Sequence, residues 1–172
     1  MHSFRILVVS VTALIAPLTY AQDFGNWTVG KTNDGAKLYA ATINDSGNIL
    51  GQYCSLTEGT CTWLLGLSIR CKVGDKYPIL INAESGAASS EVYCFESPSK
   101  GISQYAFTNF DQADTFAKTN VLVGLAFPMV GDQFKVIRFD LADANRAINS
   151  MLKRAGEQQQ APSKKSTKDR TL

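Results

Sequence analysis

The sequence feature that most constrains the fold is the period of two in residues 61–71, CTWLLGLSIRC. The odd-numbered positions are all apolar, and the even-numbered positions are mostly small or polar. This alternation predicts a β-strand with one face on a hydrophobic core. Along a strand, Cys61 and Cys71 lie about 33 Å apart at roughly 3.3 Å per residue, whereas a disulfide requires Cα atoms within about 7 Å. We therefore expect each of these cysteines to have its partner elsewhere.

The N-terminal residues have the pattern of a secretory signal peptide. A short basic start that ends at Arg5 precedes an apolar run from Ile6 to Leu18, and small residues stand before a cleavage point after Ala21. An uncleaved membrane anchor is the alternative. The apolar run is shorter than the roughly 20 residues of a membrane-spanning helix, and Pro17 interrupts it. We therefore expect an exported protein, periplasmic or secreted, with no transmembrane span after cleavage.

All four cysteines follow this segment, at Cys54, Cys61, Cys71 and Cys94. An even number of cysteines in an oxidising compartment predicts disulfides. Cys54 and Cys61 flank a stretch that suits a hairpin turn, and Cys71 and Cys94 are expected near the same end of a sheet. We predict the pairs Cys54–Cys61 and Cys71–Cys94. A zinc or redox site would need C-x-x-C spacing or histidine ligands, and neither occurs after the signal segment.

Further strands are predicted at 23–29, 37–43, 48–54, 77–83, 91–96 and 134–141, and the continuous apolar run 121–129 predicts a strand buried on both faces. Residues 44–47 and 72–76 are typical of turns, and the small residues Ser85–Ser90 predict a loop. The phenylalanines of residues 102–120 are expected to cover one end of the core, on short turns or one irregular helix. The sequence therefore predicts a mainly β fold, an antiparallel β-sandwich or barrel of about eight strands.

The C-terminal part contains one helix and a basic tail. Apolar residues recur at spacings of three and four over 142–155, which predicts an amphipathic helix. From Glu157 the sequence has no apolar period and ends in SKKSTKDRTL, which predicts disorder. We therefore expect a signal peptide at 1–21, one disulfide-bonded β domain at 22–156, and a disordered basic tail at 157–172.

Several classes of chemistry are excluded by composition. The single histidine, His2, leaves with the signal peptide, so Ser-His-Asp and Cys-His catalysis have no base. Paired cysteines supply no thiolate nucleophile. The net charge of +2 lies mainly in the tail, so the folded part lacks the basic face of a nucleic-acid-binding protein. We predict no catalytic residue, no cofactor and no metal site.

Two groups of residues remain as candidates for function. Glu84, Glu91 and Glu96 are acidic residues close in sequence, so a glycan hydrolase with paired carboxylates stays open as an alternative. The second group is an aromatic and small-residue edge that supplies the contact area typical of recognition surfaces. This candidate binding patch comprises Tyr77, Ser85, Ser89, Ser90 and Tyr93.

The order of these features resembles a known family. An export signal precedes "FGNW" (24–27) and a disulfide-bonded β region, and a late strand runs into a short closing helix in "FKVIRFDLADANRAINSM" (134–151). This arrangement resembles the invasion-associated locus B family of exported bacterial proteins. The resemblance implies a periplasmic or surface β-sandwich without known catalytic residues, acting in host-cell interaction or envelope function. The leading hypothesis is a non-enzymatic β-domain that binds a protein or envelope component. A periplasmic inhibitor or immunity protein against a toxin or lysozyme-like enzyme is the other alternative.

Overall fold

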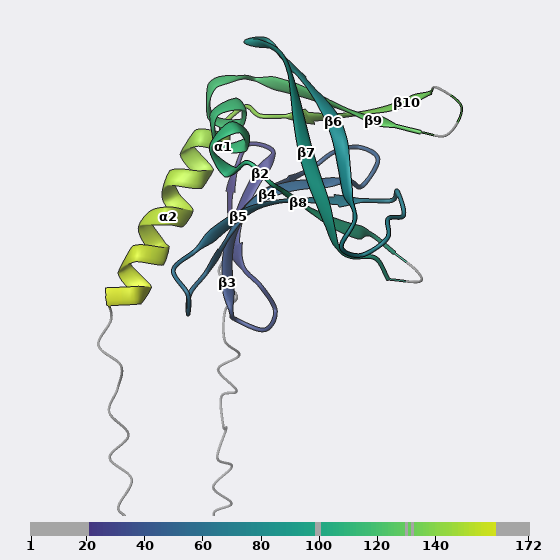
Figure 1. Cartoon of the computed structure of the whole chain (residues 1–172). Coiled ribbons are helices and arrows are strands. Elements are labelled where there is room, and N and C mark those ends of the chain that lie inside the picture. The colour runs from purple at the N-terminus through teal and green to yellow at the C-terminus, as the bar shows by residue number, and fades with distance from the viewer. Residues whose placement is uncertain (1–20, 99–100, 130, 132, 161–172) are drawn as a thin grey trace, which may run out of the picture.

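The structure is a computed structural model that describes residues 21–98, 101–129, 131 and 133–160. These residues form ten antiparallel strands in one sheet, ordered β1-β2-β3-β4-β5-β8-β7-β6-β9-β10, and two helices (Figure 1). The elements are β1 (Gln22–Phe24), β2 (Trp27–Lys31), β3 (Lys37–Ile43), β4 (Ile49–Ser55), β5 (Cys61–Leu67), β6 (Lys76–Ala83), β7 (Gly86–Glu96), β8 (Ser103–Phe107), α1 (Phe110–Thr119), β9 (Leu122–Pro128), β10 (Phe134–Asp140) and α2 (Ala144–Gln160). The mainly β, antiparallel prediction with a C-terminal helix is confirmed.

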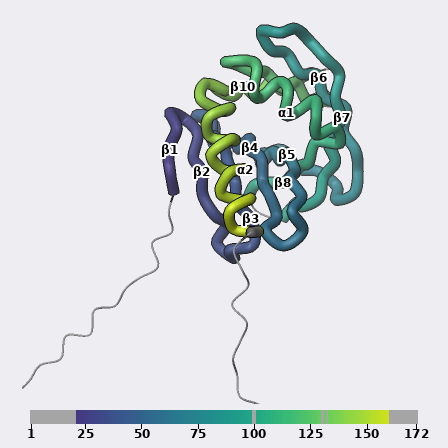
Figure 2. The backbone as a smooth tube through the Cα atoms, turned by 90° about the vertical axis from the view of Figure 1, so that its left-hand side faces the viewer, coloured from purple at the N-terminus to yellow at the C-terminus, as the bar shows by residue number. Residues whose placement is uncertain are grey.

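The sheet curls back on itself without closing. Figure 2 shows the strands turning from β1 and β2 round to β6 and β7, with β10 returning toward β2. At this opening, Trp27 Nε1 donates a hydrogen bond to Asp140 O (3.2 Å), and Asn44 Nδ2 donates to Arg138 O (3.0 Å). Side chains, not a strand ladder, therefore join the two ends of the sheet. The fold is a single open, barrel-like sheet, not two stacked sheets.

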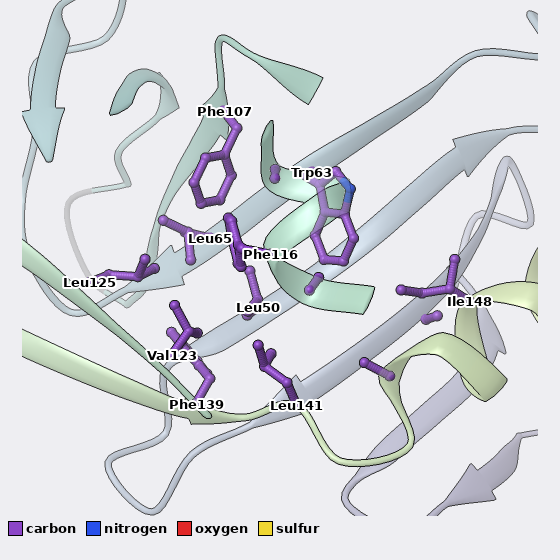
Figure 3. Close-up of a cluster of buried hydrophobic side chains, with 14 of the residues drawn as sticks. Leu50, Trp63, Leu65, Phe107, Phe116, Val123, Leu125, Phe139, Leu141 and Ile148 are labelled. Carbon is purple, nitrogen blue, oxygen red and sulfur yellow. The ribbon is translucent and has the colours of Figure 1, made fainter. Parts of the chain in front are cut away.

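The core lies on the inner face of this curl, between the strands and the two helices. Trp27 and Trp63 are fully buried and meet edge to face, with ring centroids 6.4 Å apart. Figure 3 shows Leu50, Leu65 and Val123 beside the ring of Phe116 from α1. The inner positions alternate along each strand, and this alternation is why the period of two in the sequence located the strands.

Helix α2 packs on the N-terminal half of the sheet (Figure 1). Its buried face comprises Ala144, Ala147, Ile148, Met151 and Ala155, the spacing of an amphipathic helix. The helix continues to Gln160, four residues beyond the predicted end of the domain at 156. Residues 157–160 are therefore helical, not part of a disordered tail. The predicted signal peptide and the basic residues from 161 onward lie outside the described residues.

Three local predictions differ from the structure. The strand predicted over 61–71 ends at Leu67, because the chain bends there and carries Cys71 toward β7. The loop predicted at Ser85–Ser90 is a strand: β7 begins at Gly86 and pairs with β6 from Ala83↔Gly86 onward. Residues 102–120, left without a firm prediction, form β8 and the regular helix α1.

Both predicted disulfides are confirmed. Cys54 and Cys61 lie directly opposite each other on β4 and β5, with Cα atoms 4.0 Å apart. Cys71 bonds to Cys94 of β7, with Cα atoms 6.0 Å apart, and none of the four cysteines is free. Within the described part of the chain, no helix has the length and apolar character needed to cross a membrane.

Candidate functional site

Three tyrosines gather on the outer face of the sheet. Tyr39 and Tyr53 are directly opposite each other on β3 and β4, with ring centroids 5.6 Å apart. Tyr93 of β7 lines the same hollow as Tyr53. Tyr77 and Tyr105 instead meet edge to face on the inner side at 5.9 Å. The strand tyrosines therefore divide between the two faces, and the outer set is the one available to a partner.

Two of these outer tyrosines, Tyr53 and Tyr93, line an elongated hollow. It has two adjoining parts, of about 330 and 170 Å³, which share Lys37, Tyr53 and Leu64. We name it the outer groove. Its apolar lining comprises Ile49, Tyr53, Leu64, Tyr93, Phe95 and Ile102. Tyr93 and Ile102 are 39% and 37% exposed, so apolar surface is directly accessible along the groove.

Three strand glycines allow close approaches between neighbouring groups of the sheet. A Cβ atom on Gly51 would lie 2.6 Å from Ala41 Cβ, and one on Gly66 would lie 3.0 Å from Ile102 Cγ2. A Cβ on Gly30 would lie 2.6 Å from Tyr39 Oη, so the Tyr39 ring lies directly over this glycine. Strand glycines commonly mark places where another group approaches the backbone closely. Gly66 lines the groove, whereas Gly51 and Gly30 leave room for the close approach of Ala41 and of the Tyr39 ring.

The walls of the groove come from two turns. The turn between β4 and β5 carries Ser55, Glu58 and Thr60 to one rim, and the Cys54–Cys61 disulfide closes the base of this hairpin. The turn between β2 and β3 lies beside it, since Leu56 N donates to Ala36 O (3.0 Å), and there the Thr32 hydroxyl donates a hydrogen bond to Asp34 Oδ1 (2.6 Å). The lining is thus aromatic and aliphatic at the centre and polar where these two turns border it, as in protein recognition surfaces.

The pKa values of two residues that line the groove, Tyr53 and Asp34, are shifted from their usual values. Burial raises the pKa of Tyr53 above its usual value, and Tyr39 adds a smaller contribution in the same direction. The Tyr53 phenol therefore stays neutral and can donate a hydrogen bond at any physiological pH. The hydrogen bond from Thr32 is the largest cause that lowers the pKa of Asp34, which keeps this exposed carboxylate charged.

The structure does not bring the predicted binding patch together. Tyr77 lies on the inner face, where its hydroxyl accepts a hydrogen bond from Lys72 N (3.0 Å). Ser85 lines a separate hollow of about 410 Å³ beside α1, and Ser90 Oγ is buried. Ser89 O accepts a hydrogen bond from Gln112 of α1. Of the five residues, Tyr93 alone lines the outer groove.

The three glutamates of the hydrolase alternative have separate partners. Glu84 accepts a hydrogen bond from Val121 N (2.7 Å), Glu91 pairs with Lys76 (2.9 Å), and Glu96 accepts from Gln104 Nε2 (2.8 Å). None of Glu84, Glu91 and Glu96 lines one of the hollows described above. Among the described residues, no group of three or more acidic, cysteine or histidine side chains is placed to hold a metal ion.

The register of the first hairpin differs by one residue from the prediction. A turn at 44–47 would set Tyr39 opposite Gln52, whereas the observed connection, residues 44–48, places Tyr39 opposite Tyr53. The approach of Tyr93 to this surface was beyond any such argument, because β5 and β7 are joined only through β8, which follows β7 in the chain. No local spacing in the sequence encodes that order.

The fold and groove define a class of protein: a single-sheet antiparallel β domain, bonded by two disulfides and carrying an aromatic surface groove. Among solved structures this chain is similar to invasion associated protein B from Bartonella henselae. The similarity covers 80% of this chain and 99% of that chain, with a TM-score of 0.56 and 12% sequence identity, and it shows a shared fold. No protein-family model and no curated protein matches the sequence.

Proposed function

We propose that this protein is an exported, non-catalytic domain that binds a protein or envelope component in its outer groove. The observation that carries the proposal is the groove itself, which is lined by Tyr93, Phe95 and Ile102 together with Gly66. Monomeric proteins rarely leave apolar surface continuous across several strands unless it has a binding role. Tyrosine suits that role, because it gives a large contact area with few rotatable bonds to immobilise.

The two disulfides support export, because such bonds persist in oxidising compartments. The similarity in fold to an invasion associated protein is consistent with a protein that acts at or outside the cell envelope. N-terminal sequencing after expression in a bacterium with a periplasm tests this part of the proposal. We expect the mature chain to begin at Gln22 and to appear in the periplasmic or medium fraction. Retention of residues 1–21 in the cytoplasm would contradict it.

Binding is tested by comparing groove variants on defined envelope material. Wild type, Tyr53→Ala and Tyr93→Ala are incubated with purified peptidoglycan and, separately, with immobilised envelope protein extract. Val73→Ala is the matched control, because Val73 is 58% exposed and does not line the groove. We expect one of the two materials to retain wild type and the control but to release both tyrosine variants. Equal retention of all four proteins would remove the groove from consideration.

The non-catalytic part of the proposal has its own measurement. Soluble fragments are quantified after long incubation of peptidoglycan with the purified protein. We expect no release above the buffer control. Release that Glu91→Gln abolishes would establish the carboxylate hydrolase instead.

A further inference from the structure

Strand β10 is an edge of the sheet, and its backbone groups point alternately toward β9 and away from it. Met129 N donates to Gln133 O and Leu141 N donates to Val121 O, both at 2.7 Å, and these two bonds set the alternation along the pair. The register then directs one set of residues away from β9, toward the open side of the sheet. This set is Phe134, Val136, Arg138 and Asp140.

Half of this open edge already has partners. The carbonyls of Arg138 and Asp140 accept the hydrogen bonds from Asn44 and Trp27 that join the two ends of the sheet. For the edge-facing groups of Phe134 and Val136, the described residues provide no hydrogen-bond partner. Exposed edges of this kind are templates for a further strand.

The surroundings of this free segment favour occupation. A hollow of about 290 Å³ lies between β10 and the turn that follows β3, and Val136 is among its lining residues. On the outer face Phe134 and Val136 are 65% and 47% exposed. Alternation places Lys135 on the opposite face of the strand, where it also lines the hollow. The free edge therefore presents an apolar, basic, apolar sequence of side chains.

We propose that β10 binds an extended segment of a partner protein, which adds as an antiparallel strand along Phe134–Val136. The added strand carries an acidic residue opposite Lys135 and apolar residues on either side of it. Backbone hydrogen bonds to the two free edge positions hold the strand, and the alternate side chains give selectivity. This interface uses none of the side chains that line the outer groove, and it goes beyond the function proposed above.

A second copy of this chain is a poorer occupant. A two-fold axis that pairs both free positions would set Phe134 opposite Val136 of the copy. That register puts Lys135 directly opposite Lys135 of the copy, and like charges in that position are destabilising. An acidic side chain in the partner strand converts the same position into a favourable pair.

The test uses the full mature chain and three synthetic peptides of eight residues. The acidic peptide alternates valine and glutamate, and the basic peptide alternates valine and lysine. The proline peptide is the acidic peptide with its central valines replaced by proline. Amide shifts in ¹⁵N–¹H spectra locate binding, and fluorescence anisotropy measures Kd. We expect the acidic peptide to shift the amides of residues 134–136, the basic peptide to bind at least about threefold more weakly, and the proline peptide not to bind.

Two variants make the test specific. Val136→Pro removes an edge-facing N–H without touching the bonds to β9, and we expect about tenfold weaker binding. Lys135→Glu leaves the backbone intact and should reverse the preference between the acidic and basic peptides. Val73→Pro, in the turn between Lys72 and Asp75, controls for introducing proline, since this position suits it.

The proposal is overturned if no peptide shifts residues 134–136, or if Lys135→Glu leaves the preference unchanged. Undiminished binding by a folded Val136→Pro variant would also overturn it. Sedimentation of the free protein is the last measurement. A dimer that Val136→Pro dissociates would assign the edge to self-association and reject the partner strand.

Discussion

Removing the two disulfides one at a time should lower stability unequally. Replacing Cys71 and Cys94 by alanine opens a bond between residues 23 apart in sequence, whereas the bond between Cys54 and Cys61 spans 7. In the chain-entropy model these separations correspond to about 3.4 and about 2.4 kcal/mol at 25 °C. We therefore expect the loss of Cys71–Cys94 to cost about 1 kcal/mol more.

The structure also supports a larger loss of stability on removing Cys71–Cys94 than on removing Cys54–Cys61. The shorter bond joins strands that the hairpin already aligns, because Ser55 N donates to Thr60 O (2.8 Å) beside it. The longer bond holds Cys71, which lies outside any strand, against β7. Each pair has one fully or almost fully buried member, Cys94 at 0% and Cys54 at 2% exposure, so the cavities left by alanine are comparable.

Urea unfolding of the two double variants, followed by tryptophan fluorescence, measures the difference. Trp27 and Trp63 are both in the core and report its loss. In thermal unfolding followed by the same signal, we expect the melting temperature of the variant without Cys71–Cys94 to be about 2–4 °C below that of the other. An equal cost, or a larger cost for Cys54–Cys61, would show that native-state strain or residual structure outweighs loop length, and would refute the argument.

Three further outcomes are expected. Burial, with a smaller effect of Tyr77, raises the pKa of Tyr105 to about 12, above the unfolded value of about 10. The folded state therefore keeps this proton longer than the unfolded state, and the stability of the protein should fall as pH rises from 10 to 12. Urea midpoints at pH 9 and 11 measure this fall, which should be smaller in Tyr105→Phe. Asn109→Ala removes the side chain that caps α1 and should cost about 1 kcal/mol in thermal unfolding. Gly51→Ala should cost about 1–3 kcal/mol by overpacking against Ala41. Gly124→Ala, whose Cβ meets ordinary contacts from 3.5 Å, should cost little, and equal costs would contradict this account of close packing at Gly51.

The sequence identified most strands because the inner face of the sheet is continuous. Alternation is visible wherever one face of a strand is buried, as in β3 and β5. The N-terminal part of β7 escaped detection because Gly86–Ser89 are small and exposed, so neither face shows an apolar period. Pairing with β6, not composition, makes this segment a strand. Tertiary context of this kind is absent from a local pattern.

Helix α1 stayed one of two alternatives in the sequence, short turns or one irregular helix, for a different reason. Its buried residues Ala113, Phe116 and Ala117 have helical spacing, and Asn109 is a preferred capping residue. The helix has only 10 residues, and two of its three buried side chains are alanines. The apolar signal is therefore weak, although the capping residue was readable. The core needs a short helix there, since Phe116 packs against Trp63 and Phe107.

The register of each hairpin determines which tyrosines share a face of the sheet, and therefore which surface is available for binding. In an antiparallel hairpin, a connection with an even number of residues places odd-numbered positions opposite even-numbered ones. The predicted strands 77–83 and 91–96 leave a connection of seven residues, 84–90, which would place Tyr77 and Tyr93 on the same face. The observed connection between Ala83 and Gly86 has two residues and is even, so Tyr77 and Tyr93 lie on opposite faces and do not share a patch. The odd connection of residues 44–48 instead places Tyr39 and Tyr53 on the same face. Because Tyr77 packs on Tyr105 inside the sheet, Tyr77→Ala should lower stability, and Tyr53 and Tyr93 are the positions where loss of binding can be separated from loss of fold.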